Sequence, residues 1–167
     1  KIHTTYKQNM TRTGRLSSAE PNMQNIPARD MEGKKIKKAF FPSNDVLMSC
    51  DYSQIELRLL AHISGSKELQ SAFINGEDIH TKVAADIHNI PQSEVTKEMR
   101  STAKAVIFGI VYGISGFGLG ENLNIKPSEA KKFIDKYYEL YPGVKRYMDN
   151  IIKEAYDTGV VRTLFNR

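Results

Sequence analysis

Two cationic and two aromatic side chains recur at steps of four within residues 96–112, a stretch whose pattern predicts one long helix. They are Arg100, Lys104, Phe108 and Tyr112. A step of four residues turns an α-helix by only about 40° beyond a full turn, so all four share one side. Arginine and lysine one turn apart suit the oxygens of a polyphosphate, and a ring one turn further suits a stacked base. The row therefore predicts a surface for a nucleoside triphosphate.

The other side of this helix is apolar. Met99, Ala103, Val106 and Ile110 recur at helical spacing, which predicts a stripe that packs against a core. An alternative interpretation of the row is surface cations followed by core aromatics. That interpretation explains each residue separately but leaves their alignment unexplained.

An acidic residue stands at the end of a predicted strand. Val46 to Tyr52 is a short run of strand type, and residues 53 to about 63 are predicted to form the next helix. Ser53 and Glu56 fit the Ser-x-x-Glu pattern of a capping box at its start. Asp51 lies where strand gives way to helix, a rigid position that suits metal binding. We expect this carboxylate to face the row across a gap the size of a nucleotide.

Further elements follow from periodicity and from Gly and Pro signals. Alternation in the first nine residues and the run 160–165 predict two short strands. Glycines from Gly113 to Gly120 predict a linker. Four more helices are predicted at residues 66–75, 78–88, 127–141 and 144–158.

Composition limits the class of protein. The 167 residues carry a net charge of +5, a mild excess that permits a nucleic-acid partner. No apolar run approaches 18 residues, so we expect no membrane span. The only cysteine, Cys50, excludes an internal disulfide and suits a cytoplasmic or other reducing compartment. Because the chain opens on Lys1 and has no tail-like composition, we expect it to be part of a longer protein.

Residues 11–27 have the composition of a polar loop. Their arginine and amide side chains suit contacts with phosphates, sugars and base edges in the minor groove. Composition alone favours a solvated loop.

Three blocks, in order along the chain, resemble the motifs of family A, or polymerase I-like, DNA polymerases. The first is Thr-Gly-Arg-Leu-Ser-Ser followed by Pro-Asn-x-Gln-Asn-Ile-Pro, and the second is Asp-Tyr-Ser-Gln-Ile-Glu-Leu-Arg from Asp51. The third, the most specific, runs from Arg100 to Gly113. Ile107 departs from the family pattern, in which we expect Asn. The resemblance extends from about Thr11 to Phe165.

The resemblance implies template-directed transfer of a nucleotidyl group from a deoxynucleoside triphosphate to a primer 3′-hydroxyl, in DNA replication or repair. Such enzymes use two Mg²⁺ ions. Asp51 would ligate both ions, and the backbone carbonyl of Tyr52 would assist at one. Arg100, Lys104 and His80 would neutralise the triphosphate, so Asp51, Arg100 and Lys104 are the candidate catalytic residues.

The resemblance also implies the remaining contacts. Phe108 would stack on the incoming base, and Glu56 would block the ribose 2′ position, with Gln54 in the same nucleotide site. Tyr112 would cover the template side of the nascent pair, with Gly113 also at the DNA. In the first block, Arg15, Asn22, Gln24 and Asn25 would contact the primer-template.

The resemblance implies an α+β fold of the polymerase right-hand type. Residues 1–62 would be part of an antiparallel palm sheet, and residues 63–167 would be a mostly α-helical part of the fingers. The family's second catalytic carboxylate comes from a His-Asp-Glu hairpin, and no such string occurs here. We also expect the thumb and exonuclease domains to lie outside these residues. We therefore expect this chain to need the remainder of the polymerase and not to extend a primer alone.

Two alternatives remain open. A single-subunit RNA polymerase shares the palm-and-fingers plan, although Glu56 within Ser-Gln-Ile-Glu favours deoxynucleotides. The second alternative is a fragment that binds DNA or nucleotides without catalysis. Titration with Mg²⁺ and a deoxynucleoside triphosphate separates a nucleotide site from a surface that binds DNA alone.

Overall fold

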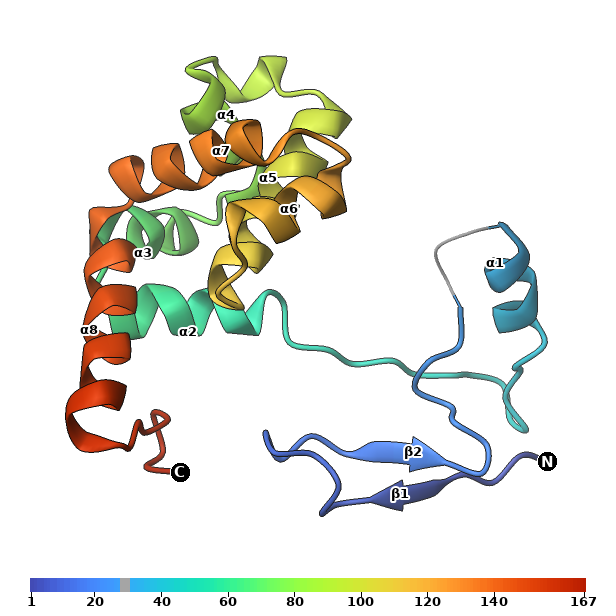
Figure 1. The fold of residues 1–167 in the computed structure, drawn as a ribbon. Helices are drawn as coiled ribbons and strands as arrows, with labels where there is room; N and C mark the ends of the chain where they lie inside the picture. The colour runs from blue at the N-terminus through green and yellow to red at the C-terminus, as the bar shows by residue number, and fades with distance from the viewer. Residues whose placement is uncertain (28–30) are drawn as a thin grey trace. The chain divides into compact units, whose positions relative to one another are not determined.

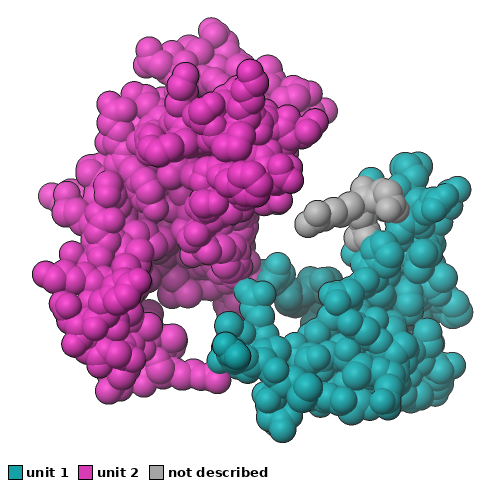
Figure 2. Space-filling model, viewed as in Figure 1, with its two compact units in different colours: residues 1–51 teal, residues 52–167 magenta. Residues whose placement is uncertain are grey.

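The computed structural model describes residues 1–27 and 31–167. They form two compact units, residues 1–51 and 52–167, which Figure 2 shows in different colours. Most of the ordered secondary structure belongs to the second unit (Figure 1). Within the described residues, no helix is both long enough and apolar enough to cross a membrane.

The first unit contains a small antiparallel sheet. Strand β1 (Thr5–Lys7) pairs with β2 (Ser17–Ala19), with Tyr6 opposite Ser18. Ser18 is buried, and its hydroxyl lies 2.7 Å from that of Thr4 and accepts a 2.8 Å hydrogen bond from the Met23 backbone N–H. The predicted N-terminal strand is therefore confirmed. Helix α1 (Met31–Lys38) follows and keeps its lysines exposed.

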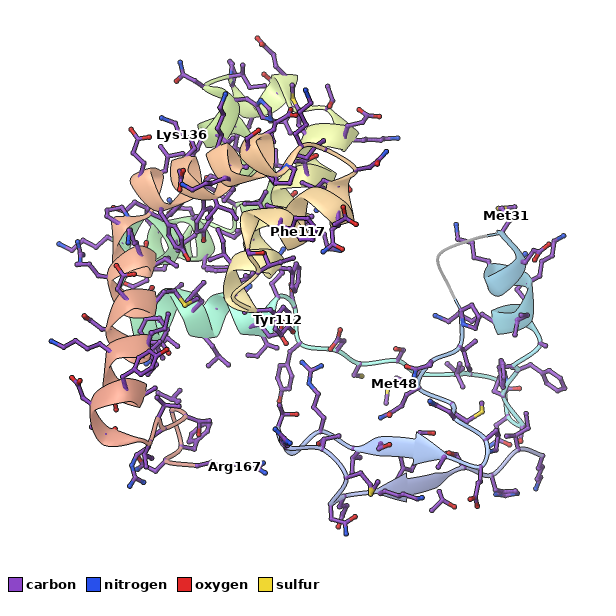
Figure 3. All side chains as sticks on the ribbon, in the orientation of Figure 1. Met31, Met48, Tyr112, Phe117, Lys136 and Arg167 are labelled. Atoms are coloured by element: carbon purple, nitrogen blue, oxygen red, sulfur yellow. The ribbon has the colours of Figure 1, made fainter. Side chains whose placement is uncertain are left out.

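The predicted strand at residues 46–52 is wrong. These residues form no regular secondary structure, and Val46, Leu47 and Met48 are all exposed. The extended segment is visible around the Met48 label in Figure 3. A strand needs a neighbouring strand to satisfy its backbone N–H and C=O groups. In the described part of the chain no strand lies beside this run, so its backbone groups have no strand to hydrogen-bond with.

The second unit is helical, and its helices begin and end close to the predicted positions. The 3₁₀ turn η1 (Gln92–Glu94) precedes the longest predicted helix. The α-helices are α2 (Ile55–Ser64), α3 (Lys67–Ile74), α4 (Ile79–His88), α5 (Lys97–Val111), α6 (Gly116–Leu123), α7 (Pro127–Leu140) and α8 (Pro142–Thr158).

Helix α5 lies at the centre of this unit and packs against α4, α6 and α7, while α8 packs against α2 (Figure 1). Its predicted apolar stripe is confirmed: Ala103, Val106 and Ile110 are buried, and Met99 packs partly buried against them. Burial of these side chains fixes which side of α5 remains exposed. The core therefore orients the opposite side, which carries the row.

Two local predictions in this unit are wrong. Helix α2 begins after Gln54, which is left-handed at φ 53°, ψ 39°, and no side chain caps it, so Ser53 and Glu56 form no capping box. The glycine-rich linker contains helix α6. Ser115 caps α6 by accepting a 3.2 Å hydrogen bond from the Gly118 N–H, and Leu119 is fully buried. This packing outweighs the low helix propensity of glycine.

The C-terminal segment also differs from its prediction, since residues 160–165 form no strand. The division of the chain at residues 62 and 63 into palm and fingers stays a prediction. In terms of compactness, helix α2 belongs with the second unit, because Leu57, Leu60 and Ala61 are part of the helical core. An apolar stripe on one helix does not indicate which neighbour will cover it.

Candidate functional site

The row lies on the exposed side of α5. Arg100 and Lys104 are exposed, Phe108 is half-buried, and Tyr112 is exposed immediately after the helix ends. Thr96 begins the helix by accepting a 3.2 Å hydrogen bond from the Met99 N–H. The cations are therefore open to a ligand rather than enclosed in the core.

A second helix brings an imidazole to the same place. His80, in the first turn of α4, has its ring centroid 6.2 Å from that of Phe108. The Lys104 ammonium lies 5.9 Å from the centre of the same Phe108 ring. His80 is buried, and its Nδ1 has no hydrogen-bond partner within the described structure. A cation, a ring and an imidazole thus meet between α4 and α5.

The environment of His80 favours the neutral ring. Burial lowers the pKa of His80, the nearby charges of Arg100 and Lys104 lower it further, and Asp78 opposes them. At neutral pH the imidazole therefore offers one N–H donor and one acceptor instead of a positive charge. A phosphate bound beside it would favour the protonated form.

Asp78 is a member of this cluster that the candidate residues did not include. Its carboxylate accepts hydrogen bonds from Arg100 Nε at 2.7 Å and Nη2 at 3.3 Å, and from the Thr81 hydroxyl at 2.6 Å. It also caps α4 by accepting from the His80 N–H at 3.3 Å. Asp immediately before a helix signals an N-cap in sequence. Its partner Arg100 lies 22 residues away and has no such local signal.

These contacts hold the Asp78 carboxylate ionised. Burial by itself would raise the pKa of Asp78, but hydrogen bonds from Arg100 and Thr81 outweigh it and bring the pKa to about 2. The ordinary value is 3.8. A lowered pKa stabilises the fold above the ordinary value, and this stabilisation is lost as the pH falls toward 2. The Asp78–Arg100 pair is therefore fully formed at neutral pH.

Glu56 and Tyr112 join the start of α2 to the end of α5. The Tyr112 hydroxyl donates to the Glu56 carboxylate, with distances of 2.9 Å to Oε1 and 3.0 Å to Oε2. Figure 3 labels Tyr112 beside the first turn of α2. Gln54, the residue immediately before α2, is half-buried, and Gly113 has φ +68°, a conformation that favours glycine. The hydrogen bond therefore brings together Glu56, the predicted sugar contact, and Tyr112, the predicted template contact, which lie 56 residues apart in sequence.

Replacing Glu56 with alanine should admit ribonucleotides more readily. Glu56 is the predicted barrier to a ribose 2′-hydroxyl, and alanine removes its carboxylate. Tyr112→Phe removes only the hydroxyl that holds the carboxylate, so we expect a smaller change in the same direction. The measurement is the ratio of deoxy- to ribonucleotide incorporation in primer extension by the full-length polymerase. An unchanged ratio in Glu56→Ala would exclude this role.

Asp51 and Tyr52 are both exposed. Within the described structure, the Asp51 carboxylate makes no hydrogen bond or ion pair, and no group of three or more His, Cys, Asp or Glu side chains is arranged to bind a metal. Mg²⁺ prefers hard oxygen ligands and keeps several waters, often with one or two carboxylates and substrate phosphates. The exposed, unpaired Asp51 carboxylate fits part of such a shell. That Asp51 faces the row on α5 stays a prediction.

The candidate DNA contacts lie in the first unit, where hydrogen bonds order their loop. The Asn22 side chain accepts from the Gln24 N–H at 3.1 Å, and the Gln24 side chain donates to the Leu16 carbonyl at 3.2 Å. This second bond joins Gln24 to the backbone of the residue that follows Arg15. Asn25 is exposed in the same loop. The first block therefore forms one local, polar surface.

The chain belongs to DNA polymerase family A, whose family model matches residues 1–167. Over its whole length it is 56% identical to DNA polymerase I of Bacillus caldotenax and 57% identical to DNA polymerase I of Lactococcus lactis subsp. lactis. It spans 19% of the length of each of these relatives.

A solved structure has the same fold. It is the POL domain of Pol1 from M. smegmatis in complex with DNA primer-template and dNTP, which is 40% identical. The TM-score is 0.88, and the match covers 99% of this chain and 30% of that one. The resemblance that the three sequence blocks indicated is thus confirmed as family membership, together with the α+β fold class.

Proposed function

We propose that this chain forms the nucleotide-binding part of a DNA-directed DNA polymerase. The observation that carries the proposal is the cluster of Lys104, Phe108 and His80 on two packed helices, with Arg100 one turn away. Relatives named DNA polymerase I and a neighbour solved with primer-template and dNTP support the same activity. The substrate would be a deoxynucleoside triphosphate and the partner a primer-template duplex.

Each residue of the cluster has a role in this proposal. Arg100 and Lys104 bind the triphosphate and stabilise the negative charge that develops on it during transfer. His80 donates an N–H to a phosphate oxygen. Phe108 stacks on the incoming base.

Other residues contact the sugar and the DNA. Glu56 excludes a ribose 2′-hydroxyl, and Gln54 lies in the same nucleotide site. Tyr112 and Gly113 cover the template side of the new base pair. In the first unit, the loop that holds Arg15, Asn22, Gln24 and Asn25 contacts the primer-template through phosphates, sugars and minor-groove base edges.

Asp51 and the backbone carbonyl of Tyr52 would hold Mg²⁺ in the complete enzyme. Two bound Mg²⁺ ions supply activation of the attacking 3′-oxygen and stabilisation of the leaving pyrophosphate. This site needs a second carboxylate opposite Asp51, and we propose that the remainder of the polymerase chain supplies it. The 167-residue chain alone should then bind nucleotide without extending a primer.

Calorimetric titration of the purified chain with dTTP and Mg²⁺ tests the proposal. We expect saturable binding that Lys104→Ala weakens. Lys145→Ala is the matched control, because Lys145 also lies over an aromatic ring, that of Tyr138 at 5.7 Å, but on α8 and paired with Asp149. Binding of primer-template DNA without dTTP would instead favour a non-catalytic DNA-binding fragment. Equal affinity for UTP and dTTP would favour an RNA polymerase relative.

A further inference from the structure

We propose that Asp78 is a positioning residue for Arg100: it holds one edge of the guanidinium so that the other edge is ready to bind a phosphate. This inference rests on the proposed function, because it names the group that prepares the triphosphate site. Asp78 itself would touch neither substrate nor metal.

The contact between the two side chains is bidentate. Arg100 Nε lies 2.7 Å from Asp78 Oδ2, and Nη2 lies 3.3 Å from Oδ1. A guanidinium has five N–H groups in a planar fork. Two of them point to Asp78, and the other three, on Nη1 and Nη2, have no partner in the part of the chain that the structure describes. This leaves a second edge with the geometry for a phosphate.

The carboxylate is itself held in place from α4. The Thr81 hydroxyl donates to Oδ2 at 2.6 Å and the His80 N–H donates to Oδ1 at 3.3 Å. Asp78 therefore ties Arg100 of α5 to the first turn of α4, where the His80 imidazole is buried beside Phe108. The two predicted phosphate-binding groups, Arg100 and His80, are brought together by one carboxylate.

An N-cap alone does not require this arrangement. Serine caps a helix about as well as aspartate, and it does so with one oxygen. Here the carboxylate uses both oxygens on Arg100 in addition to the cap. The Arg100 side chain is 45% exposed, so without Asp78 its long side chain would sample many rotamers. Binding a phosphate would then require ordering that side chain, which weakens affinity by about 3- to 10-fold.

Asp78→Ser separates these roles, because serine keeps one oxygen that can cap α4 but cannot make the bidentate contact with Arg100. The experiment measures the affinity of the purified chain for dTTP with Mg²⁺ by calorimetry, for Asp78→Ser, Arg100→Ala and the double variant. We expect Asp78→Ser to weaken binding about 3- to 10-fold, and to have no further effect when Arg100 is already alanine. Asp149→Ser, which breaks the 2.7 Å pair of Lys145 and Asp149 on α8, is the matched control and should leave affinity unchanged.

Two further measurements exclude a structural explanation. The thermal unfolding midpoint of Asp78→Ser should fall by only a few degrees, because one partly exposed ion pair is lost while the helix cap is kept, so the variant stays folded during the titration. In proton–nitrogen NMR spectra, the Nε–H signal of Arg100, assigned by its loss in Arg100→Lys, should be sharp in the parent chain and broadened by fast exchange with water in Asp78→Ser.

The outcomes distinguish this inference from the proposed function. Unchanged or tighter dTTP binding in Asp78→Ser, with Arg100→Ala clearly weakened, would overturn the positioning role and leave the nucleotide site intact. Equal weakening by Asp78→Ser in the presence and absence of the Arg100 side chain would also overturn it. If neither Arg100→Ala nor Lys104→Ala changed dTTP binding, the proposed function itself would fail.

Discussion

Replacing Lys104 with alanine is expected to lower kcat/KM for a deoxynucleoside triphosphate by about 10²–10³-fold in the full-length polymerase. Arg100 is already paired with a carboxylate, whereas Lys104 has no carboxylate within ion-pair distance in the described residues. Its full charge is therefore available to the triphosphate. Charge that develops on the phosphates during transfer strengthens this contact in the transition state, so kcat should fall as well as affinity.

Single-turnover primer extension at several nucleotide concentrations checks this expectation, since it separates affinity from the rate of transfer. Lys104→Arg keeps the charge and should lose much less than Lys104→Ala. Lys145→Ala, with its ion pair on α8, should behave as the parent enzyme does. A loss of less than about threefold in Lys104→Ala would show that the ammonium does not act on the phosphates.

The helical part of the fold could be predicted because its signals are local and repeated. Helix α5 was expected at residues 96–112 and is observed at Lys97–Val111, since fifteen residues of apolar periodicity and a Thr96 cap agree. Glycine endings were equally informative: Gly65 and Gly159 follow helices in left-handed conformations.

The wrong predictions share a physical cause. Intrinsic residue preference predicts a strand at residues 46–52 and a linker at the glycines of α6. In both places the packing of neighbouring elements determines the structure instead. An apolar run becomes a strand only when a neighbour accepts its hydrogen bonds. Conversely, glycines enter a helix when close packing requires them: a Cβ on Gly120 would lie 2.9 Å from the Ile125 carbonyl oxygen.

The candidate site also has a part that the sequence predicts and a part that it does not. The exposed row on α5 follows from spacing alone, because residues four apart on a helix whose other side is buried must point outward. Which partner each side chain meets does not follow. The Asp78–Arg100 and Glu56–Tyr112 contacts span 22 and 56 residues and depend on how α2, α4 and α5 pack. Motif resemblance located the row and Glu56, but it did not indicate that Asp78 holds Arg100 or that Glu56 contacts Tyr112.

Replacing Asp51 with asparagine is expected to abolish primer extension while leaving the fold and nucleotide binding by the α5 row largely intact. Asp51 is exposed and makes no hydrogen bond or ion pair within the described structure, so the isosteric amide disturbs no packing. Asparagine keeps an oxygen but loses the negative charge that strengthens binding of a divalent ion. Metal-assisted charge stabilisation supplies several kcal/mol to such reactions, which corresponds to a loss of about 10³-fold in rate.

Extension rates of the full-length polymerase, measured across a range of Mg²⁺ and Mn²⁺ concentrations, test this role directly. Asp45→Asn is the matched control, because Asp45 is an exposed carboxylate of the same unit and outside the proposed site. We expect Asp51→Asn to lose extension, with unchanged thermal unfolding and with dTTP affinity within about threefold of the parent. Extension by Asp51→Asn at the parental rate, at any metal concentration, would remove Asp51 from the reaction, because a carboxylate that binds the catalytic ions cannot be neutralised without cost.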